Sequence, residues 1–343
     1  MNRMAQAGFR PQASPDAMAG PVFAEICESD FPIGRLPADG GFALAVITGI
    51  EGASYRPLGA AMLVDAAGNS QGSLSSGCLE RDVVLRAREA IRADRPCNLR
   101  YGRGSPFIDI ALPCGGGLDI RILPNPDRGL LTATAGRLAA RQPARVVLRA
   151  DGRLAGPQAE GMALLIQPCL RFLVLGKGAE AACFAALAAR AGYAVEFYAP
   201  DAETRRSAGF GRPLSGTGWP AQARPDHRTA VTLFFHDHDL EPALLQAALA
   251  SPAFYVGAQG SLRAHLARRE ALAARGVGQD DIERLASPFG LIASARDPRT
   301  LAVSVLADVL DRVQRRERGT DPVAGRGTNP GPDPEMVRGQ GRR

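Results

Sequence analysis

The sequence predicts an α/β protein of two domains: an N-terminal α+β module and a C-terminal domain built on a parallel sheet. Its 343 residues are enough for two separate hydrophobic cores. Residues 170–201 form a strand–helix–strand pattern whose first loop is rich in glycine, and such a unit is typical of parallel sheets. We expect domains at 23–168 and 169–315, flanked by disordered ends at 1–22 and 316–343.

Composition and charge exclude several classes of protein. Aromatic residues make up 6% of the chain, and the formal net charge is only +6. Several positive charges lie in the Gly- and Pro-rich stretch from Arg312 to Arg343, which is typical of a solvated tail and not of a nucleic-acid-binding arm. No run approaches the roughly 18 apolar residues of a membrane span, and the first 20 residues lack the apolar core of a secretion signal. We expect a cytoplasmic protein that binds neither nucleic acid nor membrane.

The N-terminal domain is expected to alternate short strands with glycine-rich loops. The apolar pattern predicts a short helix ending at Cys27, strands at 42–48 and 61–64, a turn at 65–69, a helix at 81–92, a strand at 107–112, a helix at 130–140, and a hairpin of strands 144–148 and 163–166 with a turn at 151–152.

Two loops of this domain combine glycine with a thiol. Gly72 to Gly77 lead into Cys78 just before a helix, and a helix N-terminus stabilises anions and lowers the pKa of a thiol. Cys78 could therefore be a reactive or ligand-binding thiolate, or else a small buried hydrophobic residue. Glu80 falls in the first helical turn, where it could face a ligand or simply favour the helix dipole.

The second loop is Cys114 followed by three glycines, 115–117, inside a strand-like stretch. Glycines weaken a strand, so this position requires bare backbone. A thiol beside exposed backbone donors could cradle an anionic or soft ligand through Cys114, Gly115 and Gly116. A bulge at a sheet corner is the alternative.

Three motifs now stand in order along the chain: Gly52-x-Ser-x-x-Pro-x-Gly-Ala-x-Met62, Gly72-Ser-x-Ser-x-Gly-Cys-x-Glu80, and Cys114-Gly-Gly116. Together they resemble the XdhC/CoxI family, whose members are accessory proteins of xanthine dehydrogenase, carbon monoxide dehydrogenase and related molybdenum hydroxylases. The resemblance covers roughly residues 23–125 and 170–312. It departs at Ser76, where the family has glycine, and after Leu291, where the family has an acidic–glycine pair.

The C-terminal domain opens on Gly176-Lys177-Gly178-x-x-Ala181, which fits the dinucleotide-binding fingerprint of Rossmann-like domains. Asp201 lies twenty residues beyond Ala181, where a carboxylate that binds ribose would be expected. Lys177 is the only lysine of the chain, and it lies inside this expected phosphate loop. A tight strand-to-helix turn without a ligand is the alternative.

The remaining elements continue the strand–helix alternation. We expect a loop at 210–228, a strand at 230–235, a helix at 242–250, a strand near 254, a helix starting at Arg263 and a closing helix at 299–313. His236 and Asp237 would project beyond the carboxyl end of a strand, where ligands of such sheets bind, and Asp237 or Asp239 could cap the next helix. Neither the alternating His-Asp-His-Asp run nor the scattered cysteines predict a metal site.

The resemblance implies a function. It implies a chaperone, not an enzyme, that binds molybdenum cofactor in its plain or cytidine dinucleotide form, protects it and delivers it to a molybdenum hydroxylase apoenzyme. A cysteine desulfurase or cytidylyltransferase is a second expected partner, and a homodimer is expected. The cofactor's phosphate would occupy the Gly176–Gly178 loop, and its oxidation-prone metal end would face Cys78 and Cys114. An NAD(P)-dependent oxidoreductase and a non-catalytic docking adaptor are the alternatives.

Overall fold

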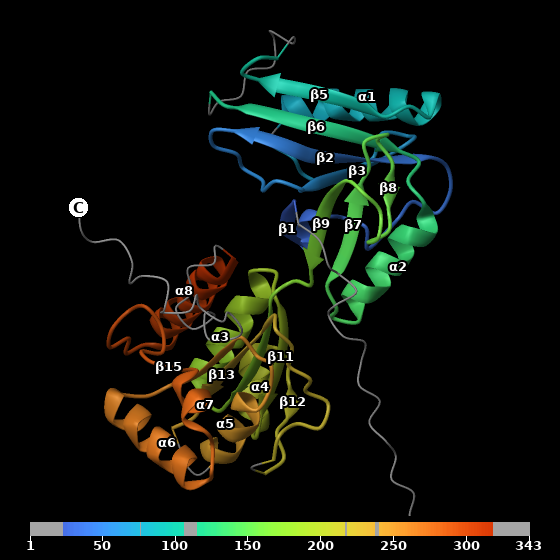
Figure 1. The fold of residues 1–343 in the computed structure, drawn as a ribbon. Helices are drawn as coiled ribbons and strands as arrows, with labels where there is room; N and C mark the ends of the chain where they lie inside the picture. Colours follow the sequence, from blue (N-terminus) through green and yellow to red (C-terminus); the bar gives the residue numbers. More distant parts are fainter. Residues whose placement is uncertain (1–22, 76, 106–114, 217, 237–239, 318–343) are drawn as a thin grey trace, which may run out of the picture. The chain divides into compact units, whose positions relative to one another are not determined.

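The computed structural model describes residues 23–75, 77–105, 115–216, 218–236 and 240–317 (Figure 1). The chain divides into two compact units, residues 1–169 and 170–343. In the described residues, no helix combines the length and the hydrophobicity needed to cross a membrane.

The first unit contains an antiparallel five-stranded sheet with the strand order β4-β3-β2-β6-β5. Its strands are β2 (Phe42–Glu51), β3 (Ala61–Asp65), β4 (Ser70–Gly72), β5 (Cys97–Gly102) and β6 (Gly117–Pro124). Helix α1 (Cys78–Ala93) covers one face of this sheet, where Ala45 and Ile47 share a core with Leu79 and Val83 of the helix. The predicted strands at 42–48 and 61–64 are confirmed, because both are apolar runs buried on two faces.

A smaller four-stranded sheet completes this unit, with the order β1-β9-β7-β8. Its strands are β1 (Ala24–Cys27), β7 (Ala144–Leu148), β8 (Leu154–Ala155) and β9 (Met162–Gln167). The same unit contains the short 3-10 helix η2 (Glu28–Asp30) and α2 (Arg128–Ala139). Leu44 and Val46 of β2 share a core with Leu164 and Ile166 of β9, so the second face of β2 is also buried. The large sheet is therefore covered on both faces along β2.

One prediction for this unit is wrong, one is confirmed, and one concerns residues that the structure does not describe. The helix expected to end at Cys27 is wrong, because Ala24–Cys27 pairs as a parallel strand with Leu164–Gln167. The expected pairing of 144–148 with 163–166 is confirmed, with the short strand β8 inserted after the turn. The expected strand at 107–112 lies outside the described residues.

The second unit contains a parallel six-stranded sheet with the order β12-β11-β10-β13-β14-β15, which confirms the predicted Rossmann-like architecture. Its strands are β10 (Arg171–Gly176), β11 (Ala194–Ala199), β12 (Arg212–Pro213), β13 (Thr229–Phe234), β14 (Tyr255–Ala258) and β15 (Leu285–Ala286). Its helices are α3 (Ala179–Arg190), α4 (Ala202–Ala208), α5 (Glu241–Leu249), α6 (Leu262–Ala274), α7 (Gln279–Glu283) and α8 (Pro298–Glu317).

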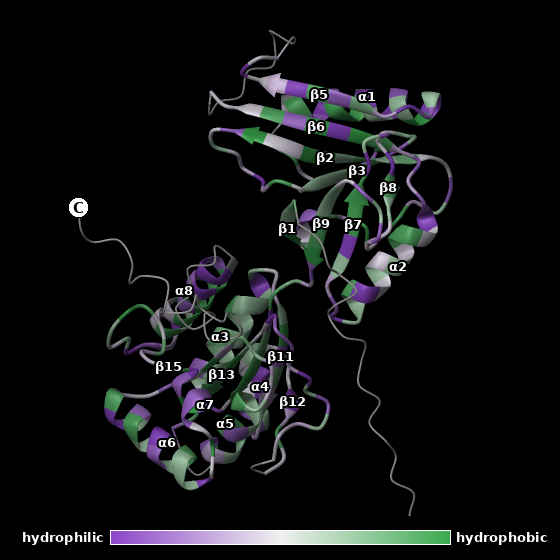
Figure 2. Ribbon diagram, in the orientation of Figure 1, coloured by the Kyte–Doolittle hydropathy of each residue, from purple (hydrophilic) through white to green (hydrophobic). Residues whose placement is uncertain are grey.

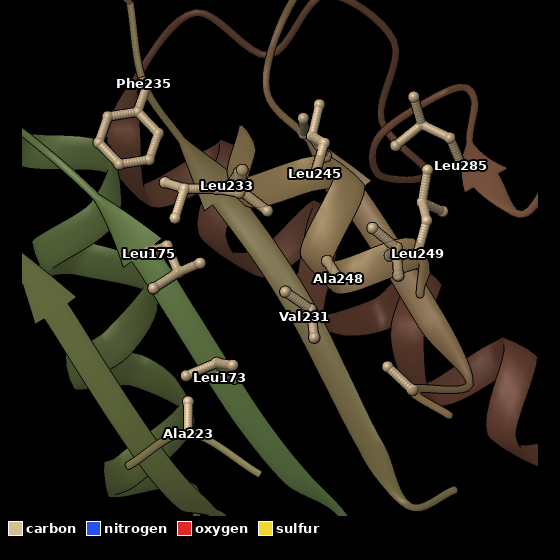
Figure 3. Packing of buried hydrophobic residues seen from close by; sticks show 14 of the residues in the cluster. Leu173, Leu175, Ala223, Val231, Leu233, Phe235, Leu245, Ala248, Leu249 and Leu285 are labelled. Carbon is tan, nitrogen blue, oxygen red and sulfur yellow. The ribbon is translucent and has the colours of Figure 1, made fainter. Parts of the chain in front are cut away.

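Alternate residues of the central strands enter two separate cores. Leu173 and Leu175 of β10 face the same core as Leu245 of α5 (Figure 3). Phe172 instead packs with Phe184 of α3 in the other core, their ring centroids 5.5 Å apart. Both faces of the sheet are thus covered by helices, which explains why these strands read as continuous apolar runs. Figure 2 shows apolar and polar residues interspersed along outer helices such as α6.

The helix starts of this unit differ in part from expectation. Helix α6 begins after Ser261, whose hydroxyl accepts a hydrogen bond from the Ala264 N–H at 3.3 Å. The N-cap of α5 is Leu240, without a side-chain cap, so the expected capping aspartate is wrong. Asp237 and Asp239 themselves lie outside the described residues.

Candidate functional site

Helix α1 begins at Cys78 itself, three residues before the predicted start. Its N-cap residue is Gly77, whose φ of 60° lies in the left-handed region that favours glycine. Cys78 therefore occupies the first position of a sixteen-residue helix, where the unpaired N–H groups and the helix dipole attract negative charge. The prediction about the Cys78 thiol itself falls outside the described part of the structure.

Glu80 turns back to hold the loop that precedes Cys78. Its Oε1 accepts hydrogen bonds from the Ser73 hydroxyl at 2.7 Å, the Leu74 N–H at 3.1 Å and the Ser75 N–H at 3.3 Å. Leu74 is fully buried in the core beneath α1, so the loop is anchored from both sides. Glu80 thus fixes the backbone of the loop that precedes Cys78.

Removing this carboxylate should loosen the loop. We expect Glu80→Ala to cost about 1–3 kcal/mol of unfolding free energy, because two partly buried N–H groups lose their acceptor. Glu80→Gln keeps an oxygen acceptor and should recover most of that loss. The measurement is urea denaturation followed by circular dichroism, with Glu89→Ala on the exposed side of α1 as the matched control. Equal effects of Glu80→Ala and Glu89→Ala would contradict the clamp.

The glycine triplet has separate roles along its length. Gly115 has a φ of 65°, and a Cβ placed there would meet open space. A Cβ on Gly117 would lie 2.2 Å from the guanidinium of Arg100, so this glycine lets the arginine cross the strand. The irregular register of β2 and β6 falls between Ile47 and Gly49, so the bulge considered as the alternative does not lie at Gly117. Cys114 lies outside the described residues.

Hydrogen bonds and strand register bring the three motifs to one end of the five-stranded sheet. Tyr101, near the end of β5, donates to Asp82 in α1 at 2.6 Å, which fixes the start of α1 at that end. The neighbouring residue Gly102 pairs with Gly117 at the start of β6. A Cβ on Gly52, just after β2, would lie 3.5 Å from the Cα of Gly116. We call this region the glycine end of the sheet.

Four charged side chains at the glycine end, carried by β2, β5, β6 and the loop after β5, are paired with one another. Arg100 binds Asp119 at 2.9 Å and also Glu51, and Arg103 binds Glu51 at 3.0 Å. Hydrogen bonds from Arg103 and Arg100 hold the pKa of Glu51 below its ordinary value, and Asp119 raises the pKa of Arg100. These charges therefore brace the loops, and the backbone donors of α1 remain the attraction for an anion.

In the second unit, the two loop glycines are required for different reasons. A Cβ on Gly176 would lie 2.7 Å from the Phe234 carbonyl oxygen and 2.7 Å from the Ala181 Cβ, so β10, β13 and α3 could not pack. Gly178 has a φ of 93°, which only glycine adopts readily. The fingerprint therefore describes a real strand-to-helix turn.

The backbone donors of this turn are already in use. The Lys177 N–H donates to the Phe234 carbonyl at 2.8 Å, and the Gly178 N–H donates to Thr204 Oγ1 at 2.9 Å. Thr204 Oγ1 donates in turn to Asp201 Oδ2 at 2.9 Å, and Asp201 Oδ1 caps α4 through the Thr204 N–H at 2.8 Å. Bonds from Thr204 and the nearby Lys177 ammonium hold the pKa of Asp201 below its ordinary value.

Both acidic and basic groups surround this turn. Glu180 Oε2 lies 3.6 Å from the position of a Cβ on Gly178, and it lies 3.5 Å from His236 Nε2. His236 is exposed, as is Lys177, and Asp237 lies outside the described residues. A phosphate group would meet the exposed Lys177 ammonium here, whereas Asp201, the carboxylate expected to bind a ribose hydroxyl, is already engaged by Thr204. This geometry does not favour NAD(P) binding.

Sequence reasoning missed three residues that shape these sites. Thr204 could have been found as the partner of an Asp-x-x-Thr cap, whereas Tyr101 and Asp82 meet only through folding. Among the described residues, no group of three or more His, Cys, Asp or Glu side chains could hold a metal ion.

Comparisons with known proteins agree with this architecture. Residues 36–102 match the model of the XdhC and CoxI family, and residues 172–309 match the XdhC Rossmann domain. The chain is 35% identical over 295 residues to the molybdenum cofactor insertion chaperone PaoD of Escherichia coli, covering 81% of this chain and 86% of PaoD. It is 25% identical over 271 residues to the uncharacterized protein YqeB of the same organism, covering 78% of this chain and 43% of YqeB.

A solved structure from Bacillus halodurans, named as a xanthine dehydrogenase, has a similar fold with a TM-score of 0.64. It covers 83% of this chain and 95% of its own chain, at 21% sequence identity. At that identity the likeness shows the fold alone.

Proposed function

This chain belongs to the XdhC and CoxI family, and from that premise we propose that it is a chaperone that binds molybdenum cofactor and inserts it into a molybdenum hydroxylase apoenzyme. The similarity to PaoD over most of both chains supports this role. The cofactor is cargo: the chaperone receives it, shields it and releases it.

One observation carries the proposal to particular residues: the three motif loops of the first unit meet at the glycine end of the sheet. There the N-terminus of α1 offers backbone donors, Cys78 stands at the first helical position, and Gly115 leaves its backbone open. Donors of this kind suit an anionic group, and a thiol suits a soft metal end. We assign Cys78, Cys114, Gly115 and Gly116 to cargo contact and Glu80 to positioning their loop.

The second unit carries a candidate phosphate site of its own. Lys177 supplies the ammonium, and the first turn of α3 supplies N–H groups that have no acceptor within the helix. Gly176 and Gly178 shape the turn, and Asp201 holds it through Thr204, so Asp201 acts by positioning. His236 follows the neighbouring strand β13 at the same end of the sheet, and Asp237 is the next residue in the sequence.

The finer parts of the proposal concern the cellular location, the assembly and the second partner of the protein. We propose the cytoplasm as its location and a homodimer as its assembly. A cysteine desulfurase or a cytidylyltransferase would be the second partner.

The proposal is tested by loading the full-length protein anaerobically with molybdenum cofactor released from a donor hydroxylase. After gel filtration we expect molybdenum, measured by mass spectrometry, and pterin, measured by fluorescence, to elute with the protein in comparable molar amounts. Titration with NAD⁺ and NADPH is the parallel arm, and it should give no binding heat. Nicotinamide binding with substrate turnover, and no retained pterin, would establish the oxidoreductase alternative.

A further inference from the structure

Two cysteines far apart in the sequence meet in the first unit. The Sγ atoms of Cys27 and Cys169 are 3.1 Å apart, and both residues are half-buried thiols. Cys27 is the last residue of β1, and Cys169 lies two residues beyond the end of β9, the parallel partner of β1. The strand register therefore carries the two side chains to the same place.

The backbone of Cys169 is held from two sides. Its N–H donates to Glu28 Oε1 at 2.9 Å, and its carbonyl accepts from Arg141 Nη1 at 2.7 Å. Glu28 follows Cys27 directly in the chain, so the same turn positions both thiols. The pair is therefore preorganised.

The surroundings of Cys169 change the acidity of its thiol. The hydrogen bond with Cys27 raises the pKa of the Cys169 thiol, and burial and the charge of Glu28 raise it further. Either sulfur can donate in the hydrogen bond that joins them. The thiolate is the form that reacts with oxidants.

We propose that Cys27 and Cys169 are a redox modification site, which a hydroperoxide converts into an intramolecular disulfide. One of the two thiols loses its proton, its thiolate attacks one peroxide oxygen, and the O–O bond breaks. That cysteine becomes a sulfenic acid while the leaving hydroxide takes up the proton as water. The sulfur of the second cysteine then attacks the sulfenic sulfur, the S–O bond breaks, and the proton of the second thiol leaves with that oxygen as a second water. Two thiols are oxidised and one hydrogen peroxide is reduced.

The bond would join the end of the edge strand β1 to the last residue of the first unit, since the second unit begins at Leu170. It would close a loop across almost the whole first unit and so restrict the unfolded chain. Oxidation would therefore stabilise the first unit and pin the chain just before the second. This inference does not rest on the proposed function.

The test treats the full-length protein with hydrogen peroxide, blocks remaining thiols with an alkylating reagent, and maps tryptic peptides by mass spectrometry without reduction. We expect a Cys27–Cys169 cross-linked peptide that disappears after dithiothreitol, and a higher Tm of the oxidised protein that also reverses. Cys27→Ser and Cys169→Ser should each abolish the cross-link and the reversible rise in Tm.

Cys97 and Cys183 provide the matched controls. Both are half-buried, and burial raises the pKa of each thiol, but they pack against other core clusters. Cys97→Ser and Cys183→Ser should leave the cross-link intact. The proposal is overturned if peroxide yields no Cys27–Cys169 peptide, or if Cys27→Ser shows the same reversible rise in Tm as the unaltered protein. The unaltered protein carries the first outcome, so a variant that failed to fold would not rescue the proposal.

Discussion

Replacing Cys78 by alanine should reduce the delivery of molybdenum cofactor to a hydroxylase apoenzyme by at least about tenfold, the equivalent of 1.4 kcal/mol of lost binding. Cys78 stands at the start of α1, at the end of the sheet where all three motif loops meet. The alanine variant keeps the helix and removes only the thiol. The measurement is anaerobic reconstitution of apoenzyme with loaded chaperone, followed by hydroxylase activity and molybdenum content.

Cys97→Ala is the matched control for this experiment. Cys97 pairs with Ile122 at the opposite end of β5 from Gly102, so it lies on the same sheet but away from the glycine end. Its loss should leave delivery unchanged. Cys114→Ala should act in the same direction as Cys78→Ala. Full delivery by the Cys78→Ala, Cys114→Ala double variant would instead support a docking adaptor that does not use thiols.

Breaking the ion pair between Glu241 and Arg268 should cost the second unit about 3–5 kcal/mol, because the partner left behind is a buried charge. Arg268 binds Glu241 through two hydrogen bonds, Nε to Oε2 at 2.8 Å and Nη2 to Oε1 at 2.9 Å. The Glu241 side chain is 0% exposed and that of Arg268 is 6% exposed. Arg268 also donates to the carbonyls of Ala258 and Gln259, so the pair joins α5, α6 and the end of β14.

Guanidinium unfolding followed by Trp219 fluorescence measures this effect. Trp219 is the only tryptophan and packs against the core that contains Leu245, so it reports on the second unit. Glu241→Ala should shift the midpoint strongly downward. Arg299→Ala breaks an ion pair in which Arg299 is 89% exposed, and it should change stability by less than about 1 kcal/mol. Similar shifts for both variants would refute the importance of burial.

Much of the fold could be predicted because its signals are local. The continuous apolar strands at 42–48 and 230–235, and the glycine turn at 176–178, depend on residues close together in the sequence. Weak local signals failed. Ala24–Cys27 is too short for its sequence pattern to indicate a helix or a strand. Parallel pairing with β9 makes it a strand. The predicted start of α1 lies after the start seen in the structure. The N-cap residue Gly77 caps the helix through its backbone, so there is no side-chain cap that the sequence could reveal.

The candidate sites divide in the same way. The positions of Cys78 and of the Gly176–Gly178 turn follow from sequence spacing. The hydrogen-bond partners of the nearby carboxylates do not follow from spacing. Glu80 turns toward Ser73, and Asp201 engages Thr204, only once the helices are placed. The spacing of the fingerprint predicts a carboxylate where a ribose hydroxyl would bind. It does not tell from which donor that carboxylate already accepts a hydrogen bond.

By itself, the sequence determined most of the longer strands and helices, where the two glycine turns lie, and to which family the motifs belong, since these depend on hydrophobic period and on local backbone freedom. Only the tertiary structure decided that three motif loops share one end of a sheet, that Glu241 and Arg268 form a buried pair, and that Cys27 lies beside Cys169. The last two contacts join residues 27 and 142 positions apart, and the geometry of all three depends on strand register and helix packing, which no local pattern specifies.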